Sequence, residues 1–446
     1  MPDVLLLTVG TGTVDKLEET LIRPFEVSFR NGEWSRIILF PSQHTGSNAF
    51  LLKERFPGFP IEVRPLRESG LEDDADACFR HFDAQIARLI DDGVGCADIT
   101  VDITRGTKAM SAALLLAALA HGVGKIRYLC GGQRDRQGMV VPGTETPRDI
   151  SAHWALERRR VNLAQDLLKR GEFASARRLM PENPAEPGGY LTREMQWIAW
   201  ACEFWGAWDR FAYKQAAQSG RRFKLPASPP DGFKWMLPSG GQLDLLEKLA
   251  GHIPPEAPDN ALYCRILAAD LLANAIRRYL EGQFEEVLVR LYRVLELIGQ
   301  TRLFEHGFDS ARIDPGNEKV AGWLREMGQN PDPGPAPLQL SREKAAHFLF
   351  YLEKLEQNED GVRIAEKLRD LSWLDDLEFG VRMRNSSILI HGFKARTPAK
   401  ESRLLRVMQH IVEFYCGESR DNPGWLESAH FRFLDPVDLP PPLSWV

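Results

Sequence analysis

Residues 99–120, ITVDITRGTKAMSAALLLAALA, decide the fold of the N-terminal part of this chain. The apolar run Ile99–Ile103 is typical of a short buried strand, and Lys108–Ala120 has the alanine and leucine content of a helix. A polar turn with one glycine joins them. A buried strand, a tight turn and a helix make up most of a βαβ unit. The stretch therefore predicts a parallel sheet that is covered by helices.

The same alternation extends through the first 150 residues. The sequence predicts helices at residues 14–29, 49–56 and 73–90. It predicts further strands at residues 4–9, 37–40, 61–63 and 126–130, and a short terminal strand at 139–141. We therefore expect an α/β, Rossmann-like N-terminal domain with a parallel sheet, over residues 1–150.

Beyond residue 150 the pattern is helical. We expect a helical connector at residues 151–258 and an all-α C-terminal domain at 259–446. A long helix at 190–218 carries four tryptophans, which we expect to pack between helices. The other predicted helices cover residues 154–180 with a break at Gly171, and 243–249, 261–280, 284–303, 341–358, 362–369, 377–390 and 401–416.

Charge and hydropathy exclude several classes of protein. The 446 residues carry 56 Lys and Arg against 62 Asp and Glu, a net charge of −6. This balance argues against a protein that coats nucleic acid through bulk positive charge. No apolar run approaches the roughly 20 residues that span a bilayer, and the N-terminal run lacks the features of a signal peptide. We expect no membrane partner.

Cysteine and histidine spacing points away from metal sites. The six cysteines are scattered without a CxxC pair, and the ten histidines are dispersed without an HExxH motif. A disulfide scaffold and a standard zinc site are both disfavoured. We expect a cytoplasmic protein with no metal and no resident cofactor.

Two loops at the predicted carboxyl ends of strands carry the first candidate site. One is Thr8–Thr13, TVGTGT, and the other is Asp102–Lys108, DITRGTK. Glycines permit close approach of the backbone to a ligand, and the N–H groups at the start of a helix bind anions. Each loop alone is equally compatible with an ordinary strand–turn–helix connection, and Thr104 or Thr107 can cap the helix that starts at Lys108. Neither is a Walker motif or a GxGxxG motif, so a P-loop NTPase and a dinucleotide enzyme are disfavoured.

The two loops together resemble those of the CARF domain, the Rossmann-like sensor of CRISPR-associated proteins. Residues 102–110 match its Asp-x-Thr-Gly-Gly-Thr-Lys-x-Met signature, with Arg105 in place of the first glycine. The resemblance implies a cyclic oligoadenylate ligand bound across a homodimer two-fold, with four adenylates favoured over six. The residues implied in ligand binding are Thr8, Gly10, Thr11, Gly12, Ser42, Gln43, Asp102, Thr104, Arg105, Gly106, Thr107, Lys108, Gly131 and Gly132.

A second candidate site lies at residues 384–392, RNSSILIHG. Arg384 and His391 are seven positions apart, so they share one face of the predicted helix. Both side chains can reach a phosphodiester, and an arginine suits an anionic transition state. The bare pattern, an arginine followed after four to six residues by a histidine, is not specific, because it also occurs at Arg148–His153, Arg342–His347 and Arg403–His410.

The context of Arg384 resembles the HEPN ribonuclease motif, in which an asparagine follows the arginine. The predicted helix pair at 261–280 and 284–303 is similar to the long helices of that fold. The resemblance implies a metal-independent endoribonuclease with Arg384, Asn385 and His391 as catalytic residues. Two protomers would place their motifs together on single-stranded RNA, and the products would be a 2′,3′-cyclic phosphate and a 5′-hydroxyl.

Both resemblances together identify the chain as similar to the CARF–HEPN ancillary ribonucleases of type III CRISPR systems. The expected fold is an α/β Rossmann-like sensor domain followed by an all-α HEPN-like domain. The expected function is RNA cleavage switched on by the cyclic oligoadenylate. Two alternatives stay open: a non-enzymatic sensor or regulator, and a ring nuclease that degrades the cyclic oligoadenylate in the N-terminal domain.

Overall fold

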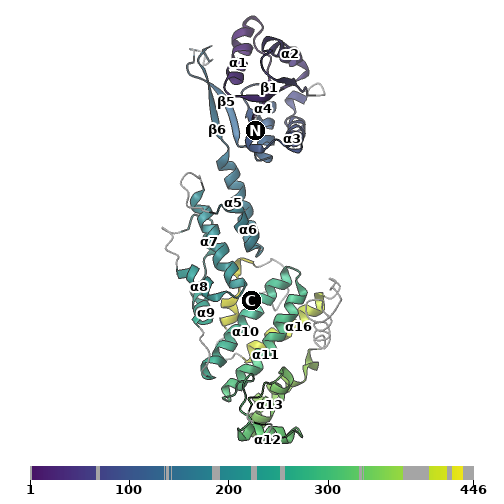
Figure 1. Cartoon of the computed structure of the whole chain (residues 1–446), viewed down its shortest axis with the longest axis vertical. Helices are drawn as coiled ribbons and strands as arrows, with labels where there is room; N and C mark the ends of the chain where they lie inside the picture. The colour runs from purple at the N-terminus through teal and green to yellow at the C-terminus, as the bar shows by residue number, and fades with distance from the viewer. Residues whose placement is uncertain are drawn as a thin grey trace. The chain divides into compact units, whose positions relative to one another are not determined.

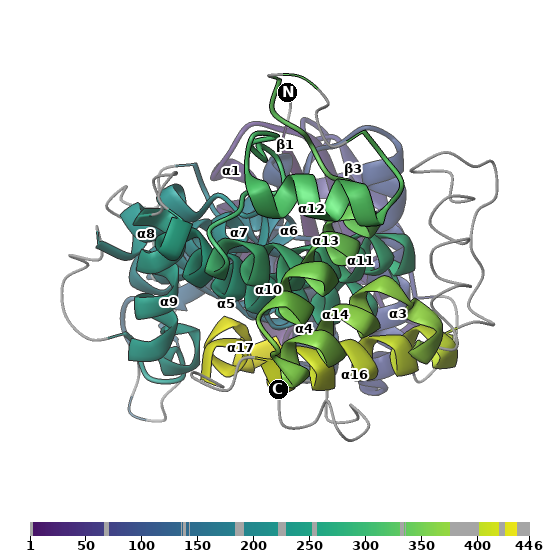
Figure 2. The ribbon, with the colours of Figure 1, turned by 90° about the horizontal axis from the view of Figure 1, so that it is seen from below.

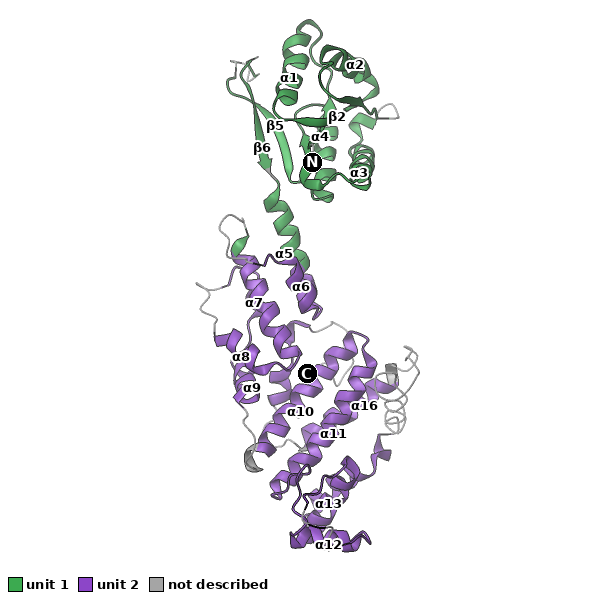
Figure 3. Ribbon diagram, in the orientation of Figure 1, with its two compact units in different colours: residues 1–163, 183–192 green, residues 164–182, 193–446 purple. Residues whose placement is uncertain are grey.

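The computed structural model describes residues 3–66, 71–134, 136, 140–141, 143–182, 191–221, 229–251, 257–330, 334, 336–374, 401–418 and 424–434. The chain divides into two compact units (Figure 3). Unit 1 comprises residues 1–163 and 183–192, and unit 2 comprises residues 164–182 and 193–446. Segments of the expected connector at 151–258 therefore contribute to both units. The division into three domains stays a prediction.

A sheet forms the centre of unit 1 (Figure 1). It has six strands in the order β3-β2-β1-β4-β5-β6. The first five strands are parallel, and β6 is antiparallel to β5. The Rossmann-like prediction is confirmed, although the sheet is mixed rather than purely parallel. The strands are β1 (Asp3–Val9), β2 (Trp34–Pro41), β3 (Ile61–Val63), β4 (Ile99–Asp102), β5 (Lys125–Gly131) and β6 (Glu145–Ser151).

The edge strand β6 was not predicted, because its sequence ETPRDIS lacks an apolar run. Charged residues and a proline are tolerated at the edge of a sheet, where only one side of the strand pairs. The short strand expected at 139–141 is reduced to a single bridge between Val140 and Arg134. Residue 139 lies outside the described residues.

Alternating side chains of β1 pack into two hydrophobic cores, one on each face of the sheet. Val4 and Leu6 belong to one buried cluster, and Leu5 and Leu7 belong to the other. The first cluster packs under α3 and α4, and the second under α1 and α2. Both faces are therefore covered, as a parallel sheet requires. The helices are α1 (Arg23–Arg30), α2 (Gly46–Arg55), α3 (Ala75–Asp91) and α4 (Lys108–Ala120).

The helix expected at residues 14–29 is interrupted. A 3-10 turn, η1 (Val14–Lys16), and a π-helical turn, η2 (Glu18–Ile22), precede α1. Pro24 lies in the first turn of α1 and has no N–H to donate to the carbonyl of Thr20 four residues earlier. The missing donor explains why regular α-helix begins only at Arg23.

Unit 2 is built of helices. Its described helices, together with α5 at the division between the units, are α5 (His153–Lys169), α6 (Phe173–Leu179), α7 (Thr192–Asp209), α8 (Tyr213–Arg221), α9 (Gly240–Gly251), α10 (Ala257–Leu280), α11 (Phe284–Glu305), α12 (Glu318–Glu326), α13 (Arg342–Leu355), α14 (Glu359–Arg369), α16 (Glu401–Glu418) and α17 (Gly424–Ala429). The α10–α11 pair forms the centre, and α11 also contacts α13, α14 and α16 (Figure 2).

The single helix expected at 190–218 is in fact two helices. The chain breaks after Asp209, where Phe211 adopts a left-handed φ of 61°. Trp197, Trp205 and Trp208 of α7 are buried, and Trp208 Nε1 donates to Asp270 at 2.9 Å. The tryptophans therefore pack between helices, as predicted. The short helix α12 was not predicted, and the predicted helix 377–390 lies outside the described residues.

Candidate functional site

The strand order places the two candidate loops side by side. From β1 the chain passes to β2 and β3 on one side, and β4 then pairs with the other side of β1. This reversal is the switch point of the sheet, where ligands of open α/β folds bind beyond the carboxyl ends of the strands. Leu7 of β1 is in register with Asp102 of β4, so both strands end at this edge.

The loops touch through two glycines. A Cβ atom on Gly10 would lie 3.4 Å from the backbone N of Gly106. Gly106 has a φ of +88°, and a Cβ there would lie 2.7 Å from Thr8 Oγ1. The Thr8 hydroxyl in turn donates to the carbonyl of Arg105. Glycine is therefore required at position 106, and the two loops form one assembly.

Asn48 of α2 orients the first loop. Its Nδ2 atom donates to the carbonyls of Gly10 at 3.1 Å and Thr11 at 2.9 Å. In a trans peptide the carbonyl and the next N–H point in opposite directions. The N–H groups of Thr11 and Gly12 therefore point away from Asn48. Sequence reasoning missed Asn48, because its partners are nearly 40 residues away in the chain.

Asp102 shapes the second loop from inside. It is buried, and its carboxylate accepts hydrogen bonds from Ser28 Oγ at 2.6 Å and from Thr104 N at 2.9 Å. The Thr104 hydroxyl also bonds to Asp102 and accepts from the N–H of Leu129 at 2.8 Å. These bonds use both carboxylate oxygens. The described contacts of Asp102 and Thr104 are structural.

Arg105, which replaces a glycine of the CARF signature, turns toward the first loop. Its Nη1 donates to the carbonyl of Thr20 at 3.3 Å, the acceptor that Pro24 cannot serve. Burial lowers the pKa of Arg105, and nearby Asp102 partly opposes this effect. Arg105 therefore braces the segment that follows the first loop, besides placing a positive charge beneath the site.

Helix α4 begins in the site. Thr107 caps it by accepting from the N–H of Met110 at 3.1 Å, which confirms the predicted cap. Lys108 follows at the first helical position with an exposed side chain. The positive end of the helix dipole and the Lys108 ammonium both favour an anion here. The Thr107 hydroxyl also donates to the carbonyl of Glu72, a buried residue that sequence reasoning missed.

The four remaining predicted residues lie at the rim. Ser42 is buried and forms a capping box with Thr45, whereas Gln43 is exposed. A Cβ on Gly131 would lie 2.4 Å from Val140, so this glycine permits packing against the chain that leads to β6. Gly132 donates its N–H to the carbonyl of Thr144 at 2.8 Å. The described contacts of Ser42 and both glycines are therefore with neighbouring chain.

The assembly offers backbone N–H groups, small residues and cations at one sheet edge. This arrangement suits a phosphate-rich ligand that approaches the backbone closely. In the described part of the chain, no group of three or more His, Cys, Asp and Glu side chains is placed to hold a metal ion. No described helix combines the length and apolar character needed to cross a bilayer.

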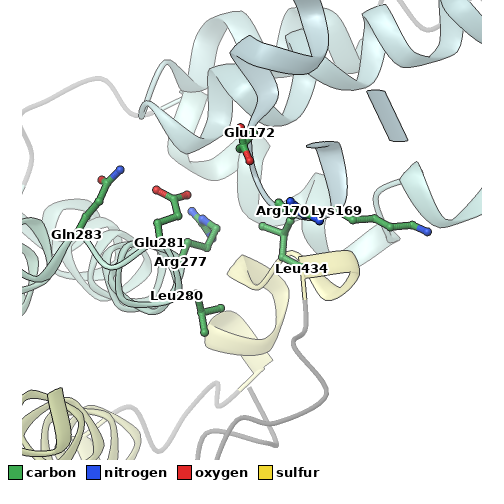
Figure 4. A pocket seen from close by; sticks show the side chains of 8 residues that line it. All are labelled: Lys169, Arg170, Glu172, Arg277, Leu280, Glu281, Gln283 and Leu434. Carbon is green, nitrogen blue, oxygen red and sulfur yellow. The ribbon is translucent and has the colours of Figure 1, made fainter. Parts of the chain in front are cut away.

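Unit 2 contains a cavity of about 620 Å³ near the ends of α5 and α10 (Figure 4). Arg277 and Glu281 of α10 line it, as do Lys169 and Arg170. Arg277 is buried and bonds to Asp209 at 2.8 Å, and burial raises the pKa of Glu281. Arg277 and Glu281 thus belong to a structural ion-pair network that Asp209 and Arg278 complete.

Known proteins of one kind resemble this chain in sequence and in fold. Residues 260–415 match a family model described as the Csm6 HEPN domain. The chain is 24% identical over 369 residues to the CRISPR system endoribonuclease Csm6 of Thermus thermophilus, with 80% of this chain and 74% of that protein covered. The structure of Enterococcus italicus Csm6 bound to cyclic hexa-2′-fluoro-hexa-dAMP matches with a TM-score of 0.55 and 14% identity, over 97% of this chain and 99% of that one.

These similarities support the resemblance of the chain to the CARF–HEPN ancillary ribonucleases of type III CRISPR systems. The matched range begins in α10, includes α11 and ends within α16. Arg384, Asn385 and His391 fall inside the matched range but outside the described residues. Their catalytic assignment stays a prediction.

Two of the other Arg–His pairs lie in described helices of the range matched to the HEPN domain. Arg342 of α13 donates to the carbonyl of Leu368 at 2.6 Å, so it ties α13 to α14. Burial lowers the pKa of His347 on the same helix, as does the charge of Arg369. Arg403 and His410 both lie on α16, and His410 lines a separate pocket that also contains Lys367.

Proposed function

We propose that this CARF–HEPN endoribonuclease is activated by a cyclic oligoadenylate bound at the switch point of unit 1. The observation that carries the proposal is the interlocked loop pair, in which Gly10 packs on Gly106 and Asn48 turns the N–H groups of Thr11 and Gly12 away from α2. Lys108 adds a cation at the start of α4. A polyanionic ring needs this combination of close backbone approach and positive charge.

The activator we propose is a ring of four adenylates, which the family resemblance favours over six. The Enterococcus relative was solved with a six-unit analogue, so ring size is the first variable to test. A symmetric ring presents equivalent phosphates to two copies of one loop, which supports a homodimer with a two-fold axis through the ring. The six free cysteines support action in the cytoplasm.

The proposed chemistry uses the RNA's own 2′-hydroxyl as nucleophile. The 2′-oxygen attacks the adjacent phosphorus while the bond to the 5′-oxygen breaks, and the products are a 2′,3′-cyclic phosphate and a 5′-hydroxyl. His391 moves a proton or donates a hydrogen bond, and Arg384 stabilises the charge of the pentacoordinate phosphorus. Asn385 positions His391 or the phosphate. None of these roles requires a metal ion.

Activation requires that the ring bind the productive dimer arrangement more tightly than the unproductive one. The dimer brings one Arg384–His391 pair from each protomer to a shared phosphate. Without this pairing a single motif supplies only one histidine.

The experiment is cleavage of a labelled single-stranded RNA in EDTA, with rings of three, four or six adenylates or with none. We expect cleavage with the four-membered ring, and a loss of at least about 100-fold in His391→Ala. Full activity of that variant would refute the catalytic assignment. Cleavage that is independent of every ring would refute the regulatory one. Following the ring itself in the same reactions shows whether unit 1 degrades it.

A further inference from the structure

A second pocket in unit 2 lies between α14, the 3-10 turn η7 (Leu371–Trp373) and α16. Its volume is about 440 Å³, within the range of pockets that bind small molecules. Most of the lining side chains are basic or aromatic, and one is acidic and one aliphatic. They are Arg363, Ile364, Lys367, Trp373, His410, Glu413 and Phe414, together with Gly417.

An aromatic pair forms one wall of this pocket. The rings of Trp373 and Phe414 lie 5.1 Å apart at 59°. Phe414 is buried, whereas Trp373 is partly exposed. The indole N–H donates to the carbonyl of Lys367 at 2.8 Å, which ties the ring to the end of α14. A partly exposed indole held in this way can stack against a nucleic-acid base.

Positive charge surrounds the aromatic pair. The Lys367 ammonium lies 5.2 Å from the ring centre of Trp373 and 5.4 Å from that of Phe414. Arg363 lies one turn earlier on α14, and its guanidinium contacts Asp360 at 3.0 Å while remaining mostly exposed. His410 adds a third basic group, and Glu413 is the acidic group in the lining. Cations beside an aromatic face are the usual means of holding single-stranded nucleic acid without a metal.

The pocket also lies at both ends of the segment that carries the predicted catalytic motif. Trp373 stands eleven positions before Arg384, and His410 stands nineteen positions after His391. Along the sequence, the chain leaves the pocket after Trp373, passes through Arg384, Asn385 and His391, and returns to the pocket on α16.

We propose that this pocket binds one nucleotide of the RNA substrate that flanks the scissile bond. The base stacks on Trp373, and the phosphate pairs with Lys367 and Arg363. His410 donates to the same phosphate or to its ribose. This inference rests on the proposed RNA cleavage and adds a substrate subsite to it. The subsite accepts any base, because every base has an aromatic face.

The test measures binding of a labelled single-stranded RNA to the full chain carrying His391→Ala, so that the RNA stays intact, with the activating ring present. We expect Trp373→Ala to weaken binding about tenfold and Trp373→Phe to weaken it much less, because a phenyl ring still stacks. Lys367→Gln should weaken binding and reduce its salt dependence. Lys344→Gln, an exposed lysine of α13, is the matched control and should change neither.

An abasic scan of the RNA identifies the nucleotide concerned. At one position, loss of the base should weaken binding to the His391→Ala protein about tenfold yet have little further effect when Trp373→Ala is also present. Additive losses at every position would overturn the stacking assignment. Unchanged binding in both Trp373→Ala and Lys367→Gln, while the wild type still cleaves RNA, would overturn the subsite and leave the proposed function standing. Thermal unfolding of each variant identifies a loss that comes from misfolding.

Discussion

At Gly106 the chain passes through the left-handed region with a φ of +88°, and a methyl group there would lie 2.7 Å from Thr8 Oγ1. Two separate penalties therefore apply to any side chain at this position. The first is backbone strain, which costs about 1–3 kcal/mol. The second is displacement of Thr8, whose hydroxyl bonds to the carbonyl of Arg105.

We expect Gly106→Ala to lower the binding of cyclic oligoadenylate by about tenfold or more, because the loops must separate to admit the methyl group. Isothermal calorimetry with the ring measures this effect. Gly93→Ala is the matched control. Gly93 also has a positive φ, +89°, but open space surrounds its Cβ position. Equal losses of affinity in the two variants would contradict the interlocked loops.

The sequence predicts the residues of the two loops but not the roles of all of them. The cap of α4 was predicted as Thr104 or Thr107, since a threonine before a helix carries that signal on its own, and Thr107 is the one that caps it. Asp102 was predicted to contact the ligand, yet its described bonds go to Ser28 and to its own loop. Asn48 was missed altogether. The bond of Asp102 to Ser28 and the bonds of Asn48 to the first loop join segments that are distant in the sequence, so a local sequence pattern does not predict them.

Among the helices, His306 joins the end of α11 to α13. Its Nε2 lies 3.1 Å from Glu353, and its Nδ1 lies 3.3 Å from Glu356. Lys319, the second residue of α12, reaches Glu356 at 3.0 Å. The hydrogen bond to Glu353 raises the pKa of His306, and the partial burial of the ring opposes that shift. The charged imidazolium is therefore the form that the folded protein stabilises.

We expect His306→Gln to destabilise the chain most at low pH. A raised folded-state pKa contributes stability that is complete below the unfolded value, about 6.5, and is lost as the pH rises through the folded value. The loss should be about 2 kcal/mol near pH 6 and should shrink in alkaline buffer. Thermal unfolding of both proteins from pH 5.5 to 9 checks this. A difference that grows with pH would contradict the assigned ion pair.

The bounds of helices and strands were predictable where the apolar periodicity of the sequence was strong. They were less predictable where tertiary contacts decided the local structure. The strand Ile61–Val63 and the helix Lys108–Ala120 have the predicted bounds. The prediction of one long helix at 190–218 was wrong, because no glycine or proline marks the break at Phe211. The edge strand β6 was missed because exposed edge positions need no apolar side chains.

Over the whole molecule, the proposed active site depends on two copies of the chain. Each copy has one Arg384–His391 pair, so a dimer with one altered copy has one intact pair. A site that one copy could build alone would keep half of its activity in such a dimer. A shared site would lose most of it.

We expect a heterodimer of one wild-type chain and one His391→Ala chain to retain less than about a tenth of wild-type activity. Two different affinity tags and sequential purification isolate this species, and the ring-dependent cleavage rate is then measured. A wild-type dimer carrying both tags is the control. Retention of about half the activity would show that each copy works independently.

The antiparallel course of β6 has a consequence for communication along the chain. Strand β5 ends at the loops, but β6 runs back across the sheet, and α5 begins two residues after it ends. The polypeptide thus leaves the sheet at the end opposite the proposed ring site, about 20 Å away for a seven-residue strand. A conformational change that passes through the backbone from the proposed ring site to α5 must follow the whole length of β6. Substitutions along β6 are therefore expected to leave ring binding intact but to weaken activation of RNA cleavage.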